Sequence, residues 1–159
     1  MKIDLAIREL HRAEQNLAKA FARASERHKV EHEIHHVARD LAAWSREHVA
    51  ELVTAGRDHG LKLAGPPAPS GPLAPVRTAT SELTGRRAEP GLLLLADLRR
   101  LHRAAAGVSL DWELLAQGAQ AVKDPGLLEL AQRCHPRTLR QLKWTNAMLK
   151  TLSPQILAS

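Results

Sequence analysis

Apolar residues recur every three or four positions along two long stretches of the chain, the spacing of amphipathic helices. Gly60 follows one periodic stretch as a C-terminal cap, and Asp124 with Pro125 interrupts another and begins a new helix. The pattern predicts four helices, over about residues 3–27, 30–59, 90–122 and 125–152.

Between residues 61 and 87 the periodicity disappears, and the segment contains the run AGPPAPSGPLAP. Proline cannot donate a backbone hydrogen bond, and glycine and serine resist ordering. We therefore expect a long, mostly irregular crossover between two helical hairpins, 3–59 and 90–152. The expected fold is one all-α domain over residues 1–159, an antiparallel four-helix bundle made of these two hairpins.

Pro136 lies inside the fourth predicted helix. Because proline removes one backbone hydrogen bond, we expect a kink or a break near Gln132 to His135.

Composition narrows the class of protein. Only 3% of the 159 residues are aromatic, which argues against an all-β fold. The single cysteine, Cys134, rules out a disulfide within the chain, and its place on an apolar helix face favours an inert, buried thiol. The opening MKIDLAIREL has no apolar signal core, and the longest apolar run falls far short of the roughly 20 residues of a membrane span. We expect a cytoplasmic protein that does not insert into membranes.

The sequence LHRA at residues 10–13 recurs at 101–104, at the middle of the first and third predicted helices. If the two halves of the chain are aligned on this repeat, with an insertion of two residues further on, Ser45 aligns with Thr138 and His48 aligns with Gln141. Such a duplicated helix pair with one long connection is the arrangement of the ferritin-like folds.

The segments ELHRAEQNL at 9–17 and REHVAEL at 46–52 are similar to the opening of the first helix and the close of the second in the YciF-like stress proteins of the ferritin-like superfamily. The resemblance implies a four-helix bundle and a role under stress. It also implies a central di-metal site, built from a Glu on each of two helices and a Glu-x-x-His on each of the other two.

Only Glu14 and His48 match that ligand pattern. Ala105 replaces a ligand on the third helix, and the inward polar positions form a predicted layer of Glu14, Ser45, His48, Thr138 and Gln141. Two metal ions need several bridging carboxylates, so we expect no cofactor and a polar layer that fixes helix register. A single-metal site held by Glu14 and His48 remains an alternative.

Two other patterns contain metal-ligating residues. A literal Glu-x-x-His occurs at Glu33 and His36, but Ile34 holds the inward position beside it. Imidazoles also cluster near the first predicted turn, at His28, His32, His35 and His36, where adventitious capture of Zn, Ni or Cu is the expected chemistry.

The formal net charge is +6, and the basic surplus falls in the second half of the chain. One stripe of the fourth predicted helix carries Arg133, Arg137, Arg140, Lys143 and Lys150. The stripe fits a solvated helix face or a surface for an anionic partner. No phosphate loop or RNA-binding signature accompanies it, so nucleic acid is not the expected partner.

The main hypothesis is a non-enzymatic ferritin-like bundle that acts by binding or by self-association, for example as a homodimer. A second hypothesis is an iron-binding oxidase of the same fold with an unusual site. A third is binding of DNA or another polyanion by the basic stripe.

Overall fold

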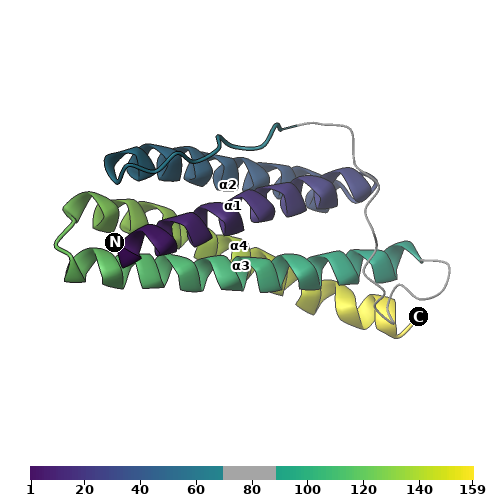
Figure 1. Ribbon diagram of the computed structural model, residues 1–159. Coiled ribbons are helices and arrows are strands. Elements are labelled where there is room, and N and C mark those ends of the chain that lie inside the picture. The colour runs from purple at the N-terminus through teal and green to yellow at the C-terminus, as the bar shows by residue number, and fades with distance from the viewer. Residues whose placement is uncertain (70–88) are drawn as a thin grey trace.

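The computed structural model describes residues 1–69 and 89–159, which form four α-helices and no strand (Figure 1). The all-helical prediction is therefore confirmed, and the helix bounds agree with the predicted ones to within a few residues, except that the last helix runs on past residue 152. The helices are α1 (Lys2–Arg27), α2 (His32–Asp58), α3 (Pro90–Ala121) and α4 (Pro125–Leu157).

Short polar signals set the helix ends. The Asp124 side chain caps α4 by accepting a hydrogen bond from the Leu127 amide at 3.1 Å. At the end of α2, Gly60 adopts a φ of 72°, a conformation that glycine tolerates without strain. This turn lets the Leu61 amide donate back to the Gly56 carbonyl at 2.8 Å.

Of the kink or break predicted near Gln132 to His135, the break is wrong, because α4 is one continuous helix through Pro136. The proline ring lies on the exposed face, while Cys134 and Thr138 on either side are buried against the other helices. Burial on both sides of the proline offsets the loss of a single backbone hydrogen bond.

Helix α1 packs along α2 and α3 packs along α4, and α1 also packs against α3. Phe21, Leu52, Trp112 and Leu130 bring one core residue from each helix. Contact between α2 and α4 is much sparser than in the other three helix pairs. The bundle is therefore least tightly closed along the α2–α4 side. Within the described ranges, no helix is long and apolar enough to cross a bilayer.

Residues 61–69 form neither helix nor strand and run back over α1 and α2 (Figure 1). Nε2 of His11 lies 2.7 Å from the Ala64 carbonyl oxygen, and the Gln15 amide donates to the Gly65 carbonyl at 2.9 Å. Leu61 is buried against the core. The start of the predicted crossover is thus attached to α1, and its remainder, residues 70–87, lies outside the described residues.

Candidate functional site

A layer of polar side chains lies inside the bundle at mid-height. Its members are each at most 1% exposed: Glu14 of α1, Ser45 and His48 of α2, and Thr138 and Gln141 of α4. Helix α3 faces the same interior with Ala105 and Trp112, both fully buried. All five predicted layer residues are therefore in the interior, because the heptad-like spacing that places leucines inward also places these residues inward.

Glu14 and His48 form a direct pair. Nδ1 of His48 lies 2.5 Å from Oε2 of Glu14. Burial raises the pKa of the Glu14 carboxyl above its usual range, and the hydrogen bond and charge of His48 oppose that rise. The only carboxylate of the layer is thus already engaged by the only imidazole.

Gln141 joins α4 to α2. Its amide nitrogen donates to the Ser45 hydroxyl at 2.9 Å and to the Leu41 backbone carbonyl at 3.0 Å. The layer therefore ties three of the four helices in one rotational register.

Trp112 closes the layer on the α3 side. Its ring meets the His48 imidazole edge to face, with centroids 5.8 Å apart and planes at 83°. Such tilted contacts are favourable for aromatic rings, and here the contact fixes the orientation of the imidazole. His48 is therefore held by Glu14 on one side and by Trp112 on the other.

The layer does not fit a di-metal centre. It offers one carboxylate, and the His48 nitrogen that faces Glu14 is used in the pair. Thr138 and Ala105 supply no charge to neutralise two cations. Within residues 1–69 and 89–159, no group of three or more His, Cys, Asp or Glu side chains could hold a metal ion. Several buried atoms nevertheless lack a hydrogen-bond partner among the described residues, including Oε1 of Glu14, Nε2 of His48 and Oγ1 of Thr138.

A groove between α2 and α4 lies beside this layer. It consists of two neighbouring pockets, of about 450 Å³ and about 350 Å³, which share Glu51 and Arg133 in their lining. His48 and Cys134 contribute to the lining of the smaller pocket. The groove is the direct result of the sparse contact between these two helices, and it reaches the edge of the buried layer.

Ion pairs cross the groove from α4 to α2. Arg133 pairs with Glu51 at 3.5 Å, and Arg137 pairs with Glu47. Arg137 also lies over the ring of Trp44, 5.2 Å from its centroid. Two members of the predicted basic stripe are therefore opposed by carboxylates of α2. The other three, Arg140, Lys143 and Lys150, are exposed and form no ion pair with any described residue.

Cys134 is buried beside the smaller pocket, and its thiol donates to Glu51 at 3.2 Å. Burial raises the pKa of this thiol, and the neighbouring Glu51 carboxylate raises it further. The thiolate, which is the nucleophilic form, is therefore disfavoured, in keeping with an inert cysteine.

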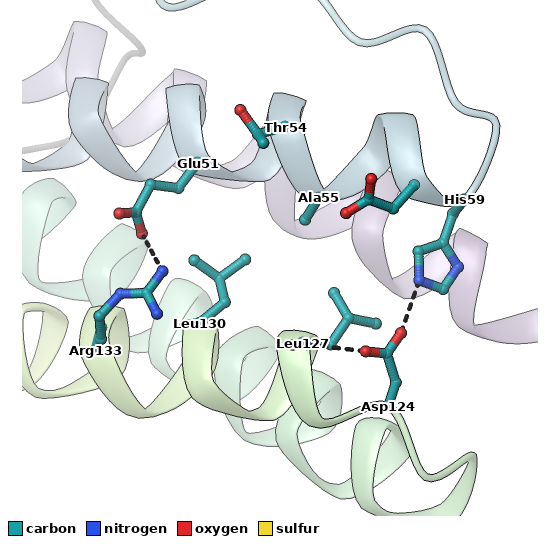
Figure 2. A pocket seen from close by; sticks show the side chains of 10 residues that line it. Glu51, Thr54, Ala55, His59, Asp124, Leu127, Leu130 and Arg133 are labelled. Atoms are coloured by element: carbon teal, nitrogen blue, oxygen red, sulfur yellow. Dashed lines mark hydrogen bonds and ion pairs between the residues drawn. The ribbon is translucent and has the colours of Figure 1, made fainter.

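One end of the larger pocket is closed by His59. Its Nε2 lies 3.0 Å from the Asp124 carboxylate (Figure 2). Its Nδ1 lies 3.2 Å from the Asp4 carboxylate of α1. The backbone hydrogen bond from Leu127 lowers the pKa of Asp124 most, and the bond from His59 lowers it further. This end of the groove thus carries an ionised carboxylate.

Of the four histidines near the first turn, His32, His35 and His36 lie together: the His36 ring stacks on His32 and meets His35 edge-on, with the latter two centroids 5.0 Å apart. His28 is buried and its Nε2 lies 2.7 Å from the Asp97 carboxylate of α3, which Arg27 also contacts at 3.0 Å. His35 is bound to Ser25, with Nδ1 2.8 Å from the Ser25 carbonyl oxygen. His32 and His36 are exposed and stack with centroids 6.4 Å apart, and Glu33 is exposed beside them.

Sequence reasoning did not predict the ion pairs that Glu47 and Glu51 of α2, and Asp97 of α3, form with other helices. Glu47 and Glu51 are four residues apart, as are Arg133 and Arg137, and this matched spacing was a usable signal for paired helix faces. Asp97 gave no such signal, because its partners lie at the end of a helix about 70 residues away in the sequence.

Comparison with known proteins identifies no relative: no family model matches the chain, and no curated protein or solved structure matches it.

Proposed function

We propose that this chain is a ferritin-like bundle that acts by non-enzymatic binding, with its ligand site in the groove between α2 and α4. The observation that carries the proposal is the open α2–α4 side, where about 450 Å³ and about 350 Å³ of space adjoin. Pockets of this size accommodate small molecules. The buried layer beside the groove then serves as a structural remnant of a metal site.

The contacts at the helix ends support the ferritin-like topology of two antiparallel hairpins. Arg27, at the end of α1, pairs with Asp97 near the start of α3. Near the other end of the bundle, Ile3 of α1 lies beside Gly118 of α3. His59, which follows α2, bonds to Asp124, which precedes α4. An up-down-down-up order with one long crossover accounts for all three contacts.

Binding in the groove is favoured over catalysis in the layer for two reasons. The Glu14 carboxylate and the His48 imidazole are paired with each other and shielded from solvent. The nearest thiol, Cys134, is held in its neutral form by burial. The basic stripe of α4 is a weaker site for an anionic partner, since Arg133 and Arg137 already face carboxylates.

The proposal is tested by NMR with uniformly ¹⁵N-labelled protein and a mixed set of cationic, neutral and anionic fragments. We expect shift changes to concentrate on amides of α2 and α4 that line the groove. Thr54 is exposed and lines the larger pocket, so Thr54→Trp should fill it and remove these changes. Ala50, one turn earlier, is exposed and lines neither pocket, so Ala50→Trp is the matched control. Fragments that leave the groove amides unmoved, whatever their charge, would overturn the proposal.

A further inference from the structure

The larger pocket of the groove has an electrostatic character opposite to that of the whole protein. The chain carries a formal net charge of +6, yet the lining contains three carboxylates, Glu51, Asp58 and Asp124, against one guanidinium, Arg133. The fifth ionisable group, His59, bridges two carboxylates at the closed end. A concave site in which one sign of charge predominates concentrates ligands of the other sign.

The carboxylates stand at different places around the pocket, so they do not form a compact ligand set for a metal ion. Asp124 lies at the closed end, and Glu51 lies at the opposite end, toward the second pocket (Figure 2). Asp58 forms no ion pair with any residue of the described ranges. Its charge is therefore available to a ligand, whereas that of Glu51 is shared with Arg133.

Between the charged groups the pocket is apolar. Leu127 and Leu130 of α4, each 3% exposed, face Ala55 of α2 across the groove (Figure 2). Aliphatic carbons bound here would lose contact with water against side chains that are already packed into the core. The lining therefore combines an apolar middle with carboxylates at its rim.

We propose that this pocket binds a small organic cation, with its ammonium or guanidinium group at the carboxylates and its aliphatic body against Leu127 and Leu130. This inference rests on the proposed function, because it assigns the class of ligand to the same groove. Charge complementarity selects the cation, and the leucines select an organic cation over a hydrated inorganic one.

Three probes with the same six-carbon chain separate charge from hydrophobic contact: hexylammonium, 1-hexanol and hexanoate. We expect hexylammonium to bind in the groove, with the alcohol at least about tenfold weaker and hexanoate without measurable binding. Calorimetry in phosphate rather than an amine buffer gives the affinities, and ¹⁵N shifts of Ala55, Leu127 and Leu130 give the location.

Groove binding of hexanoate or hexanol as tight as that of hexylammonium would overturn the cation assignment and leave the groove function standing. If none of the three probes shifts the groove amides while other fragments do, the cation assignment also fails. If no fragment of any kind does, the proposed function itself fails.

Two matched variants on α2 show whether the effect is local. Asp58→Asn removes a lining carboxylate, and Asp40→Asn removes an exposed carboxylate that lines neither pocket. We expect Asp58→Asn to weaken hexylammonium binding by about threefold to tenfold and Asp40→Asn to leave it unchanged. Both positions are exposed, so melting temperatures should stay at the unmodified value. Equal losses in the two variants would mean a general effect of net charge and would overturn the assigned site.

Discussion

Nδ1 of His48 lies 2.5 Å from Oε2 of Glu14, and both side chains are withdrawn from solvent between α1, which begins at Lys2, and α2, which begins at His32. A buried carboxylate is costly unless a partner compensates it, and here one imidazole does so. The pair therefore couples the rotation of α1 to that of α2.

Removal of the carboxylate should destabilise the bundle. Glu14→Ala leaves Nδ1 of His48 buried without its acceptor, and we expect the free energy of unfolding to fall by about 1–3 kcal/mol. Urea denaturation followed by circular dichroism measures the change. Wild-type stability in this variant would show that the pair contributes nothing to the fold.

The pH dependence of stability should carry the signature of Glu14. Its pKa in the folded state is raised above the ordinary value of 4.5, mainly by burial. The folded chain therefore binds the Glu14 proton more tightly than the unfolded chain, and protonation of Glu14 stabilises the fold. This stabilisation is complete below about pH 4.5 and is lost as pH rises through the folded-state pKa.

Glu14→Gln abolishes that titration while it keeps an acceptor for His48. We expect the stability of the variant relative to the unmodified protein to increase as pH rises above about 4.5. Urea titrations of both proteins across this range give the difference. A difference that does not vary with pH would contradict the raised pKa.

Removing the charge of two aspartates of α3 should change the stability of the protein in different directions. Asp97 is buried between Arg27 and His28, so Asp97→Asn should cost about 1–3 kcal/mol of unfolding free energy. Burial, and to a lesser extent Glu9, raises the pKa of Asp111, so its ionised form is disfavoured. Asp111→Asn should therefore leave thermal stability unchanged or increase it. Comparison of the two melting curves tests both statements, and a larger loss in Asp111→Asn would refute them.

Cys134 should react slowly with thiol reagents in the native protein. Burial keeps its pKa high and its surface covered, whereas the unfolded chain exposes it fully. We expect 5,5′-dithiobis(2-nitrobenzoate) to label it at least about a hundredfold faster in denaturant than in buffer, because Cys134 is exposed in only a small fraction of native molecules at any time. Because the chain has one cysteine, the absorbance change reports this site alone. Rapid native labelling would indicate that the groove opens down to the layer.

Iron should not bind at di-metal stoichiometry. Two divalent ions in the layer would share one carboxylate and leave most of their charge uncompensated. Elemental analysis of untagged protein and anaerobic Fe(II) titration should give well under one tight iron per chain, with no rapid oxidation phase. Two irons per chain that are lost in His48→Ala would overturn both this expectation and the proposed function.

Much of the fold follows from local spacing. The inward positions of Ile7, Leu10 and Leu17 also fix the direction of Glu14, since all four lie on one face of a helix with 3.6 residues per turn. The same reasoning places His48 and Gln141 inward on their helices. Helix ends could also be predicted from the sequence where a capping residue was present, as at Asp124 and Gly60.

The contacts between helices depend on how far each helix is shifted along its neighbours and how far apart the two lie, and the local spacing of residues does not determine either quantity. Arg137 was assigned to a basic stripe from the residues of its own helix, but its partner Glu47 comes from α2. The contact of His59 with Asp124 joins two helix ends that are 65 residues apart. The groove itself results from the separation of α2 and α4, and no residue type marks such a gap in the sequence.

The contact between Trp112 and His48 gives the molecule an optical reporter at its centre. The chain has no tyrosine, so its near-ultraviolet emission comes from three indoles with distinct surroundings. Trp44 lies under Arg137 at the groove, Trp144 lies near Phe21, and Trp112 touches the imidazole of the layer. Because the emission of an indole depends on what its ring touches, a protein that retains only Trp112 would report in its fluorescence whether the Glu14–His48 pair stays in place.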